Sequence, residues 1–108
     1  RYGSQYLKPN GNPVILSNGG FQWDIVVGLW YGSKTNRYVS FKNPSKNSYI
    51  RHAGYVCHDH NYSTVPLYLK DATFIYHRHG NGYKFQSVNY PHLYLGLQGN
   101  RLIPDICG

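Results

Sequence analysis

Short apolar runs, each interrupted by a glycine at a fixed distance, recur three times along the chain. In each copy a Tyr-Leu or Tyr-Ile pair is followed by glycine, five residues after the tyrosine, and a second apolar run then begins. Glycine readily adopts the positive φ that tight turns require, so each copy predicts a β-hairpin. The copies are Tyr6 to Gly11 with residues 14–16, Tyr49 to Gly54 with residues 55–57, and Tyr94 to Gly99 with residues 102–103.

Further strands are predicted on either side of these hairpins. Two of them end at a proline, at residues 40–44 and 87–91, and two others cover residues 23–27 and 72–76. Successive side chains of a strand point to opposite faces, so residues two apart share one face. The pattern therefore predicts one core lined by these alternating apolar positions: Trp23, Ile25, Val27, Phe74 and Tyr76.

The repeated tyrosines are 43 and 45 residues apart. Three copies of a four-strand unit predict a β-trefoil with pseudo-repeats at approximately 1–36, 37–80 and 81–108, whereas a β-propeller needs about four or more blades. The first unit begins at its second strand, and the third ends before its fourth. We therefore expect the first and last strands to be missing from this chain, because it is a fragment or because a second chain completes the barrel.

The composition favours one folded, all-β domain over residues 1–108. Hydrophobic residues make up 41% and aromatic residues 17% of the chain, which is far more apolar surface than disordered chains carry. Glutamate is absent, while twelve glycines and six prolines disfavour helices. No segment approaches the roughly 20 apolar residues of a membrane-spanning helix.

The formal net charge is +7, from eleven Lys and Arg against four Asp. The basic residues occur singly rather than in runs, which does not favour a nucleic-acid partner. The charge leaves one alternative function open. The chain would then be a secreted, cytokine-like β-trefoil that binds a sulfated glycan or a receptor through its basic surface.

Two cysteines, Cys57 and Cys107, are compatible with one disulfide bond, and Asn61-Tyr62-Ser63 is an acceptor pattern for N-glycosylation. Together they predict a secreted glycoprotein, because disulfides persist in oxidising compartments. The sequence leaves open whether the two cysteines pair with each other or with another chain.

Residues 48–52 (Ser-Tyr-Ile-Arg-His) and 71–74 (Asp-Ala-Thr-Phe) form a paired signature. It resembles that of the C-terminal domain of arabinofuranosidase B, an arabinose-binding carbohydrate-binding module. Residues 85–91 before Tyr94-Leu95, and Trp23 with residues 26–29, add weaker matches. The resemblance implies a lectin-like β-trefoil without catalytic activity or cofactor.

The resemblance also implies a site in the middle unit, where His52 and Asp71 would hydrogen-bond the hydroxyls of a pentose or hexose. A carboxylate accepts hydroxyl bonds, and an imidazole donates or accepts another. Tyr62 and Tyr90, in expected loops, are candidates for stacking on the sugar ring, whereas Tyr49 is expected to be structural.

This chain departs from the family pattern in ways that leave one pocket intact. Ala53 replaces a tyrosine that often follows the histidine and forms part of the pocket wall. The first unit has Pro9 and Gly20 at the histidine and aspartate positions, and the third has Leu97. The departures predict weak, monovalent binding, and they leave the preferred sugar open.

The histidines and aspartates of the chain raise two other kinds of site, a metal site and a glycosidase active site. Residues two apart in a strand share a face, so two His-x-His pairs on neighbouring strands would form a metal site from His58, His60, His77 and His79.

A glycosidase needs two facing carboxyl groups. The four aspartates lie in different units, which argues against an enzyme: Asp24, Asp59, Asp71 and Asp105. Asp59 and Asp105 are expected to form turns at the end of the third strand of their units.

Overall fold

The computed structural model describes residues 6–11, 14–17, 21–53, 56–80, 82–98 and 101–104. Within these ranges the chain forms ten β-strands and one short helix. The strands are β1 (Tyr6–Pro9), β2 (Val14–Ser17), β3 (Asp24–Val27), β4 (Tyr38–Lys42), β5 (Ser48–Ala53), β6 (Val56–Asn61), β7 (Phe74–His79), β8 (Gly82–Ser87), β9 (Tyr94–Gln98) and β10 (Arg101–Pro104), and the helix is α1 (Pro66–Asp71).

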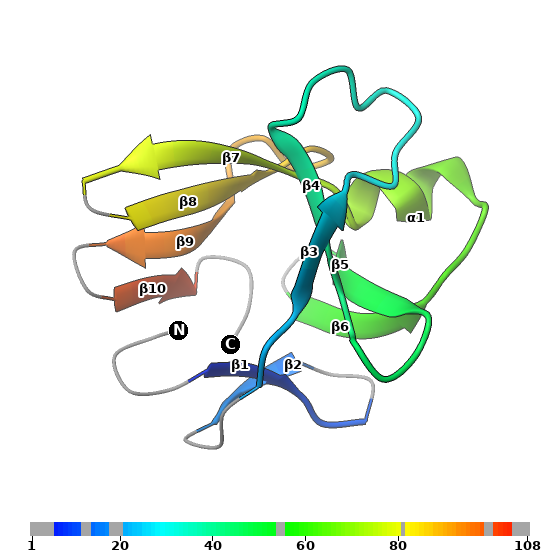
Figure 1. The fold of residues 1–108 in the computed structure, drawn as a ribbon, viewed down its shortest axis with the longest axis horizontal. Helices are drawn as coiled ribbons and strands as arrows, with labels where there is room; N and C mark the ends of the chain where they lie inside the picture. Colours follow the sequence, from blue (N-terminus) through cyan, green and yellow to red (C-terminus); the bar gives the residue numbers. More distant parts are fainter. Residues whose placement is uncertain are drawn as a thin grey trace.

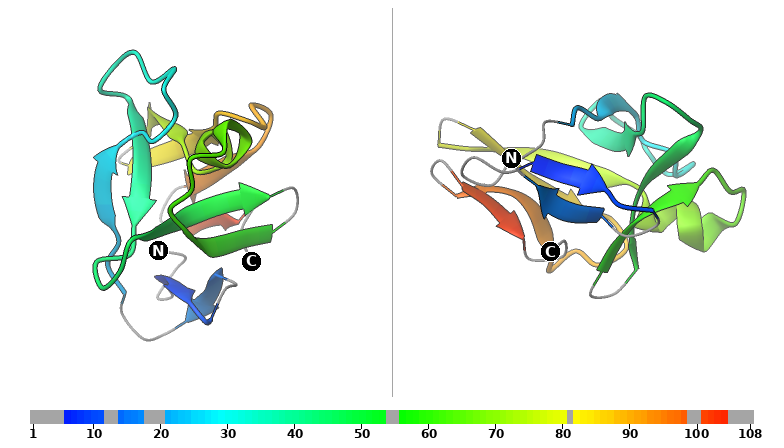
Figure 2. Two further views of the ribbon diagram at one scale, coloured as in Figure 1. Left: turned by 90° about the vertical axis from the view of Figure 1, so that its right-hand side faces the viewer. Right: turned by 90° about the horizontal axis from the view of Figure 1, so that it is seen from below.

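Eight of these strands form one antiparallel sheet in the order β10-β9-β8-β7-β4-β5-β6, with β3 added alongside β4. Strands β1 and β2 form a separate hairpin at the edge of the molecule (Figure 1), where β2 contacts β6. Figure 2 shows this hairpin from two further sides. The all-β prediction is confirmed for the described residues, with the addition of α1.

The three predicted hairpins are present as β1–β2, β5–β6 and β9–β10, and they share one register. In each, the residue after the repeated tyrosine lies opposite the residue nine positions further along the chain. The equivalent pairs are Leu7 with Leu16, Ile50 with Asp59, and Leu95 with Pro104. Gly11 has the expected positive φ of 67°, whereas Gly54 and Gly99 lie outside the described residues.

The core joins β4, β7 and β8 through three phenylalanine rings. The ring centroid of Phe41 lies 5.6 Å from that of Phe74 and 4.9 Å from that of Phe85. Such contacts stabilise beyond simple burial of apolar area. The core cluster consists of Val14, Val39, Phe41, Ile50, Cys57, Phe74 and Leu95, with Trp23, Tyr76, Phe85 and Leu93 packed against it.

The expectation of a common buried face is confirmed for Phe74, which is fully buried, and it is wrong for two residues of β3. Ile25 and Val27 are 63% and 80% exposed. Their cross-strand partners are Phe41 and Val39, so they lie on the predicted face. They remain exposed because β3 pairs only with β4 among the described strands, so no described strand covers its other side.

The strand predicted over residues 87–91 is also misplaced, since β8 ends at Ser87. The backbone N–H of Tyr90 donates to Ser87 Oγ at 3.0 Å, and the N–H of Leu93 donates to the Tyr90 carbonyl at 2.9 Å. These bonds close a turn that leads into β9. A serine side chain that caps a turn competes with continued strand pairing, so the chain turns here.

Helix α1 was not predicted, because composition alone disfavoured helices. Its local signals are a proline at the first turn, directly after the extended Val65, and Lys70 in the last turn. Proline suits the start of a helix and a cation suits its end. With six residues, α1 is too short to cross a membrane, and no other helix that could do so occurs in the described part of the chain.

Candidate functional site

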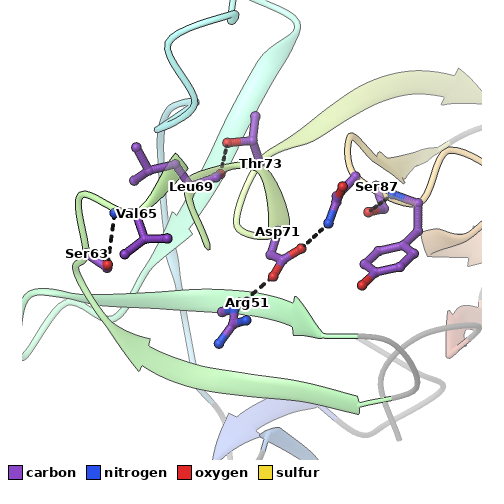
Figure 3. A network of polar contacts seen from close by, with 9 residues as sticks. Arg51, Ser63, Val65, Leu69, Asp71, Thr73 and Ser87 are labelled. Carbon is purple, nitrogen blue, oxygen red and sulfur yellow. Dashed lines mark hydrogen bonds and ion pairs between the residues drawn. The ribbon is translucent and has the colours of Figure 1, made fainter. Parts of the chain in front are cut away.

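Arg51 on β5 and Asp71 at the end of α1 point toward each other (Figure 3). Arg51 Nε donates to Asp71 Oδ2 at 2.9 Å, and Asn89 Nδ2, from the turn after β8, donates to Asp71 Oδ1. The Arg51 guanidinium carbon also lies 3.8 Å from the ring centroid of Tyr68. The carboxylate therefore joins three elements that are far apart in the sequence.

His52 and Tyr90, the neighbours of Arg51 and Asn89, form a second contact between the same segments. Their ring centroids are 4.7 Å apart, with the planes inclined by 70°. This is an edge-to-face arrangement, which is an energetically favourable geometry for a pair of rings. The structure thus brings together, directly or through their sequence neighbours, three predicted site residues: His52, Asp71 and Tyr90.

Hydrogen bonds with β4, with α1 and with the backbone of Trp30 hold the segment 71–74 in place. Ser40 Oγ donates to the Ala72 carbonyl at 2.7 Å, and Thr73 Oγ1 donates to the Leu69 carbonyl at 2.8 Å. Thr73 Oγ1 also accepts the backbone N–H of Trp30 at 3.0 Å. All four residues of the segment are buried. The Asp-Ala-Thr-Phe motif is therefore a packed unit that fixes the position of Asp71.

Tyr62, the fourth predicted site residue, lies on a different side of Arg51. It is 47% exposed, and its ring centroid lies 6.3 Å from that of Tyr49. A cleft between α1 and the β5–β6 hairpin is lined by both tyrosines, by Arg51 and by Tyr68. Arg51 therefore lines this cleft and also donates a hydrogen bond to Asp71, which is not among the residues that line the cleft.

Burial limits which of these groups a ligand reaches directly. His52 is fully buried and Asp71 is 2% exposed, whereas the Arg51 side chain is 17% exposed and Tyr90 is half-buried. Asn89 and Tyr90, from the turn after β8, contact the two residues of the expected His/Asp pocket, Asp71 and His52 respectively. Chemically, the cluster offers hydrogen-bond donors, a carboxylate acceptor and aromatic faces, a combination that suits neutral polyhydroxy ligands.

Sequence reasoning did not assign Arg51, Tyr68 or Asn89 to the site. Arg51 belongs to the quoted signature and stands next to His52, so its position in the sequence was a usable signal. Asn89 stands next to Tyr90 in the same way. Tyr68 lies on the helix that was not predicted, and nothing in the pattern separated it from the other tyrosines.

The alternative metal site required the two His-x-His pairs to lie on neighbouring strands. His58 and His60 lie on β6 and His77 lies on β7, and β4 and β5 separate these strands in the sheet. Moreover, the imidazole Nε2 of His77 lies 2.9 Å from Gln86 Oε1. No group of metal-binding side chains is found in the described ranges. The topology therefore contradicts this alternative.

Asp59 was expected to form a turn, and this is wrong. It lies within β6, is 3% exposed, and accepts a hydrogen bond from Asn43 Nδ2 at 3.1 Å. Lys46 Nζ lies 3.4 Å from the same carboxylate oxygen. A buried carboxylate needs such partners, so Asp59 fixes the turn between β4 and β5. The corresponding Asp105 lies outside the described residues.

Cys57 is 2% exposed and does not carry a free thiol. Its expected partner, Cys107, lies outside the described residues. The pairing of these two cysteines therefore stays a prediction.

Comparisons with known proteins identify a matching family and solved structures of similar fold. The family described as the Alpha-L-arabinofuranosidase B (ABFB) domain matches residues 9–105. A search of curated proteins returned no match. None of the comparisons supports the cytokine-like alternative.

Solved structures of GH54 α-L-arabinofuranosidases share the fold. The structure soaked with a cyclic sulfate inhibitor has a TM-score of 0.73 at 22% identity. An arabinofuranosidase complexed with arabinofuranosyl-alpha-1,2-xylobiose has a TM-score of 0.69 at 24% identity. Both matches cover 92% of this chain, which spans only 22% of the length of those proteins.

Proposed function

The chain belongs to the alpha-L-arabinofuranosidase B (ABFB) domain family, and from this membership we propose that it is a non-catalytic, lectin-like module that binds carbohydrate. The observation that carries the proposal is the family match over residues 9–105, which includes both signature segments. The ligand that we propose is a terminal arabinofuranosyl group, since one related enzyme was crystallised with an arabinofuranosyl-substituted xylobiose.

Asp71 is the proposed anchor for the sugar hydroxyls. A carboxylate has about four lone-pair positions, and the structure uses two of them, for Arg51 and Asn89. Two positions therefore remain for hydroxyl groups. Because Asp71 is almost fully buried, we propose that the turn carrying Asn89 and Tyr90 moves aside when a sugar binds, which would also free the lone-pair position that Asn89 occupies. His52, which lies against Tyr90, would then provide a further hydrogen bond.

Aromatic contacts complete the proposed site. The apolar face of a sugar ring packs well on an aromatic plane, while the tyrosine hydroxyl bonds a sugar hydroxyl. Tyr90 borders the buried His52 directly. Tyr62 is exposed at the cleft that Arg51 shares, so it contacts the next residue of a longer glycan.

Titration of the chain with arabinofuranosyl-xylobiose, followed by NMR, tests the proposal. We expect shifts of the His52 and Tyr90 resonances that xylobiose alone does not produce. Asp71→Asn should abolish them, whereas Asp24→Asn, the same change at an exposed position of β3, should not. If the shifts are absent in the unaltered chain, or persist in Asp71→Asn, the proposed site is wrong.

We further propose that the architecture is a β-trefoil whose first and last strands lie outside this chain. The common register of the hairpins β1–β2, β5–β6 and β9–β10 supports a threefold pseudo-symmetry. A crystal structure in which rotations of about 120° fail to superpose these hairpins would contradict it.

We also propose that the protein is secreted and carries an N-linked glycan at Asn61, which is exposed at the end of β6. The test is to express the protein in a secreting eukaryotic host and treat it with peptide N-glycosidase. The treatment should lower the mass of the protein by the mass of one glycan. An unchanged mass would contradict this assignment.

A further inference from the structure

Asn89 and Tyr90, which contact Asp71 and His52, both belong to the turn between β8 and β9. We call this turn, residues 88–93, the site turn. Its position decides whether the two contacts form, so the groups that hold it also determine the geometry of the proposed sugar site. These groups lie on two sides of the turn.

On one side, the site turn is bonded to the segment that ends α1 and leads into β7. The backbone N–H of Val88 donates to the Thr73 carbonyl at 3.1 Å, close in sequence to the bond between Asn89 and Asp71. A movement of the whole turn away from this segment breaks the Val88 bond as well. The Val88 amide proton therefore reports the position of the site turn without any ligand.

On the other side, the Gln86 side chain holds the site turn. Its Nε2 atom donates to the Pro91 carbonyl at 2.8 Å, and its Oε1 atom lies 2.9 Å from His77 Nε2. Gln86 lies opposite Ile75 in the β7–β8 pair, so His77, two residues further along β7, lies on the same face of the sheet. The amide therefore connects β7 to the site turn.

These contacts fix the donor and acceptor roles of both side chains. The Pro91 carbonyl only accepts hydrogen bonds, so the amide nitrogen of Gln86 faces it and the amide oxygen faces His77. His77 Nε2 therefore carries a proton and donates to this oxygen. Arg37 Nη2, which only donates, lies 3.2 Å from His77 Nδ1, so Nδ1 accepts. His77 thus keeps the Gln86 amide in the orientation that bonds Pro91.

The preceding repeat holds its turn with a side chain at the equivalent position. Lys42 lies opposite the repeated Tyr49, as Gln86 lies opposite the repeated Tyr94. Lys42 Nζ donates to the Lys46 carbonyl at 3.1 Å, in the turn between β4 and β5. A long donor side chain at this strand position therefore holds a carbonyl of the following turn in both repeats. The later repeat uses a planar amide with a fixed orientation, whereas an ammonium group has three donors that rotate.

Resting on the proposed function, we propose that Gln86, oriented by His77, is a positioning residue of the sugar site, because it holds the site turn in contact with Asp71 and His52. Under that function the turn moves aside when a sugar binds, so Gln86 sets the fraction of molecules that are open to the sugar. Loss of its bond to Pro91 destabilises only the closed position, and the sugar should then bind more tightly. A purely structural role would give the opposite sign, since a damaged fold binds more weakly.

Hydrogen exchange of the Val88 amide, measured by NMR on the full chain without ligand, tests the hold on the turn. Gln86→Met keeps the side-chain length and removes both bonds, so exchange should become about two- to fivefold faster. The Tyr62 amide, which donates to the Asn47 carbonyl at 3.0 Å, should not change. Gln22→Met, the same substitution at an exposed position, is the matched control and should leave Val88 unaffected. Unchanged Val88 exchange in Gln86→Met would refute the proposal.

His77 should act on the turn only through Gln86. His77→Phe should therefore speed the Val88 exchange, but it should add nothing when Gln86→Met is already present. In the unaltered chain, a proton–nitrogen correlation spectrum of the imidazole should place the ring proton on Nε2. A proton on Nδ1, or additive effects of the two substitutions, would overturn the role of His77.

Titration with arabinofuranosyl-xylobiose, followed by NMR, tests the consequence for binding. Gln86→Met should bind the sugar about two- to fivefold more tightly, by the same factor as its Val88 exchange is faster, because both report one opening equilibrium. Weaker or unchanged binding would overturn the positioning role. If the unaltered chain and the variant both fail to bind the sugar while the exchange still differs, the proposed function is wrong, and with it the role of Gln86 in binding, whereas its hold on the turn is confirmed.

Discussion

The guanidinium of Arg51 and the carboxylate of Asp71 form an ion pair, 2.9 Å from Nε to Oδ2, between β5 and the end of α1. The Asp71 side chain is 3% exposed, so Arg51 and Asn89 supply the hydrogen bonds that water would otherwise give to its carboxylate. One contact therefore stabilises the fold and orients the carboxylate that we propose for sugar binding.

Arg51→Met should lower the free energy of unfolding by about 2–4 kcal/mol, because it leaves a buried carboxylate without its cation. Methionine keeps much of the packing against Tyr68, so the loss reports mainly the ion pair. Urea unfolding followed by tryptophan fluorescence measures it. Arg78→Met, at an exposed position, should change the stability by less than about 0.5 kcal/mol. Equal losses in both variants would contradict the role of the pair.

Thr73→Val should destabilise the chain by about 1–3 kcal/mol, since it removes the acceptor of the Trp30 N–H and the donor to the Leu69 carbonyl while keeping the volume. Thr73→Ser keeps the hydroxyl and removes one methyl group, so it should lose about 1 kcal/mol. Guanidinium unfolding compares the two. The prediction fails if serine is tolerated no better than valine.

Tyr90→Ala should abolish binding of arabinofuranosyl-xylobiose and lower the stability by about 1–2 kcal/mol, because it removes the ring that packs on His52. Tyr90→Phe keeps this ring contact and removes only the hydroxyl. Its stability should therefore remain within about 0.5 kcal/mol of the unaltered chain. Calorimetric titration and thermal unfolding of both variants separate the ring contact from the hydroxyl.

A disulfide between Cys57 and Cys107 should appear in the intact mass as a loss of two hydrogen atoms relative to the reduced chain. Reduction should lower the free energy of unfolding by about 2–5 kcal/mol, as is typical for small secreted domains. Peptide mapping under non-reducing conditions identifies the pair. A disulfide-linked dimer would instead show that Cys57 pairs with another chain.

The hairpins could be predicted from sequence because their signal is local. A turn forms where glycine stands between two apolar runs, and neither the repeated tyrosine nor Gly11 needs information from distant residues. The burial of β3, by contrast, was predicted wrongly, because burial is not a local property. The alternation identifies the face on which Ile25 and Val27 lie, but whether that face is covered depends on other strands.

The candidate site shows the same division. Its signature residues, His52 and Asp71, can be recognised in the sequence because they stand in a family motif. That Asp71 accepts hydrogen bonds from Arg51 and Asn89, and that Tyr90 covers His52, depends on contacts over 18 to 38 positions of the chain. Such contacts leave no periodic trace in a single sequence.

The sequence by itself therefore determined the all-β class, the three hairpins and the family signature, because turn chemistry and side-chain alternation act over a few residues. Only the tertiary structure decided the order of the strands, the burial of Asp71 and the exposure of Val27. These properties depend on which segments pack together, and packing is a sum over residues that are distant in the chain.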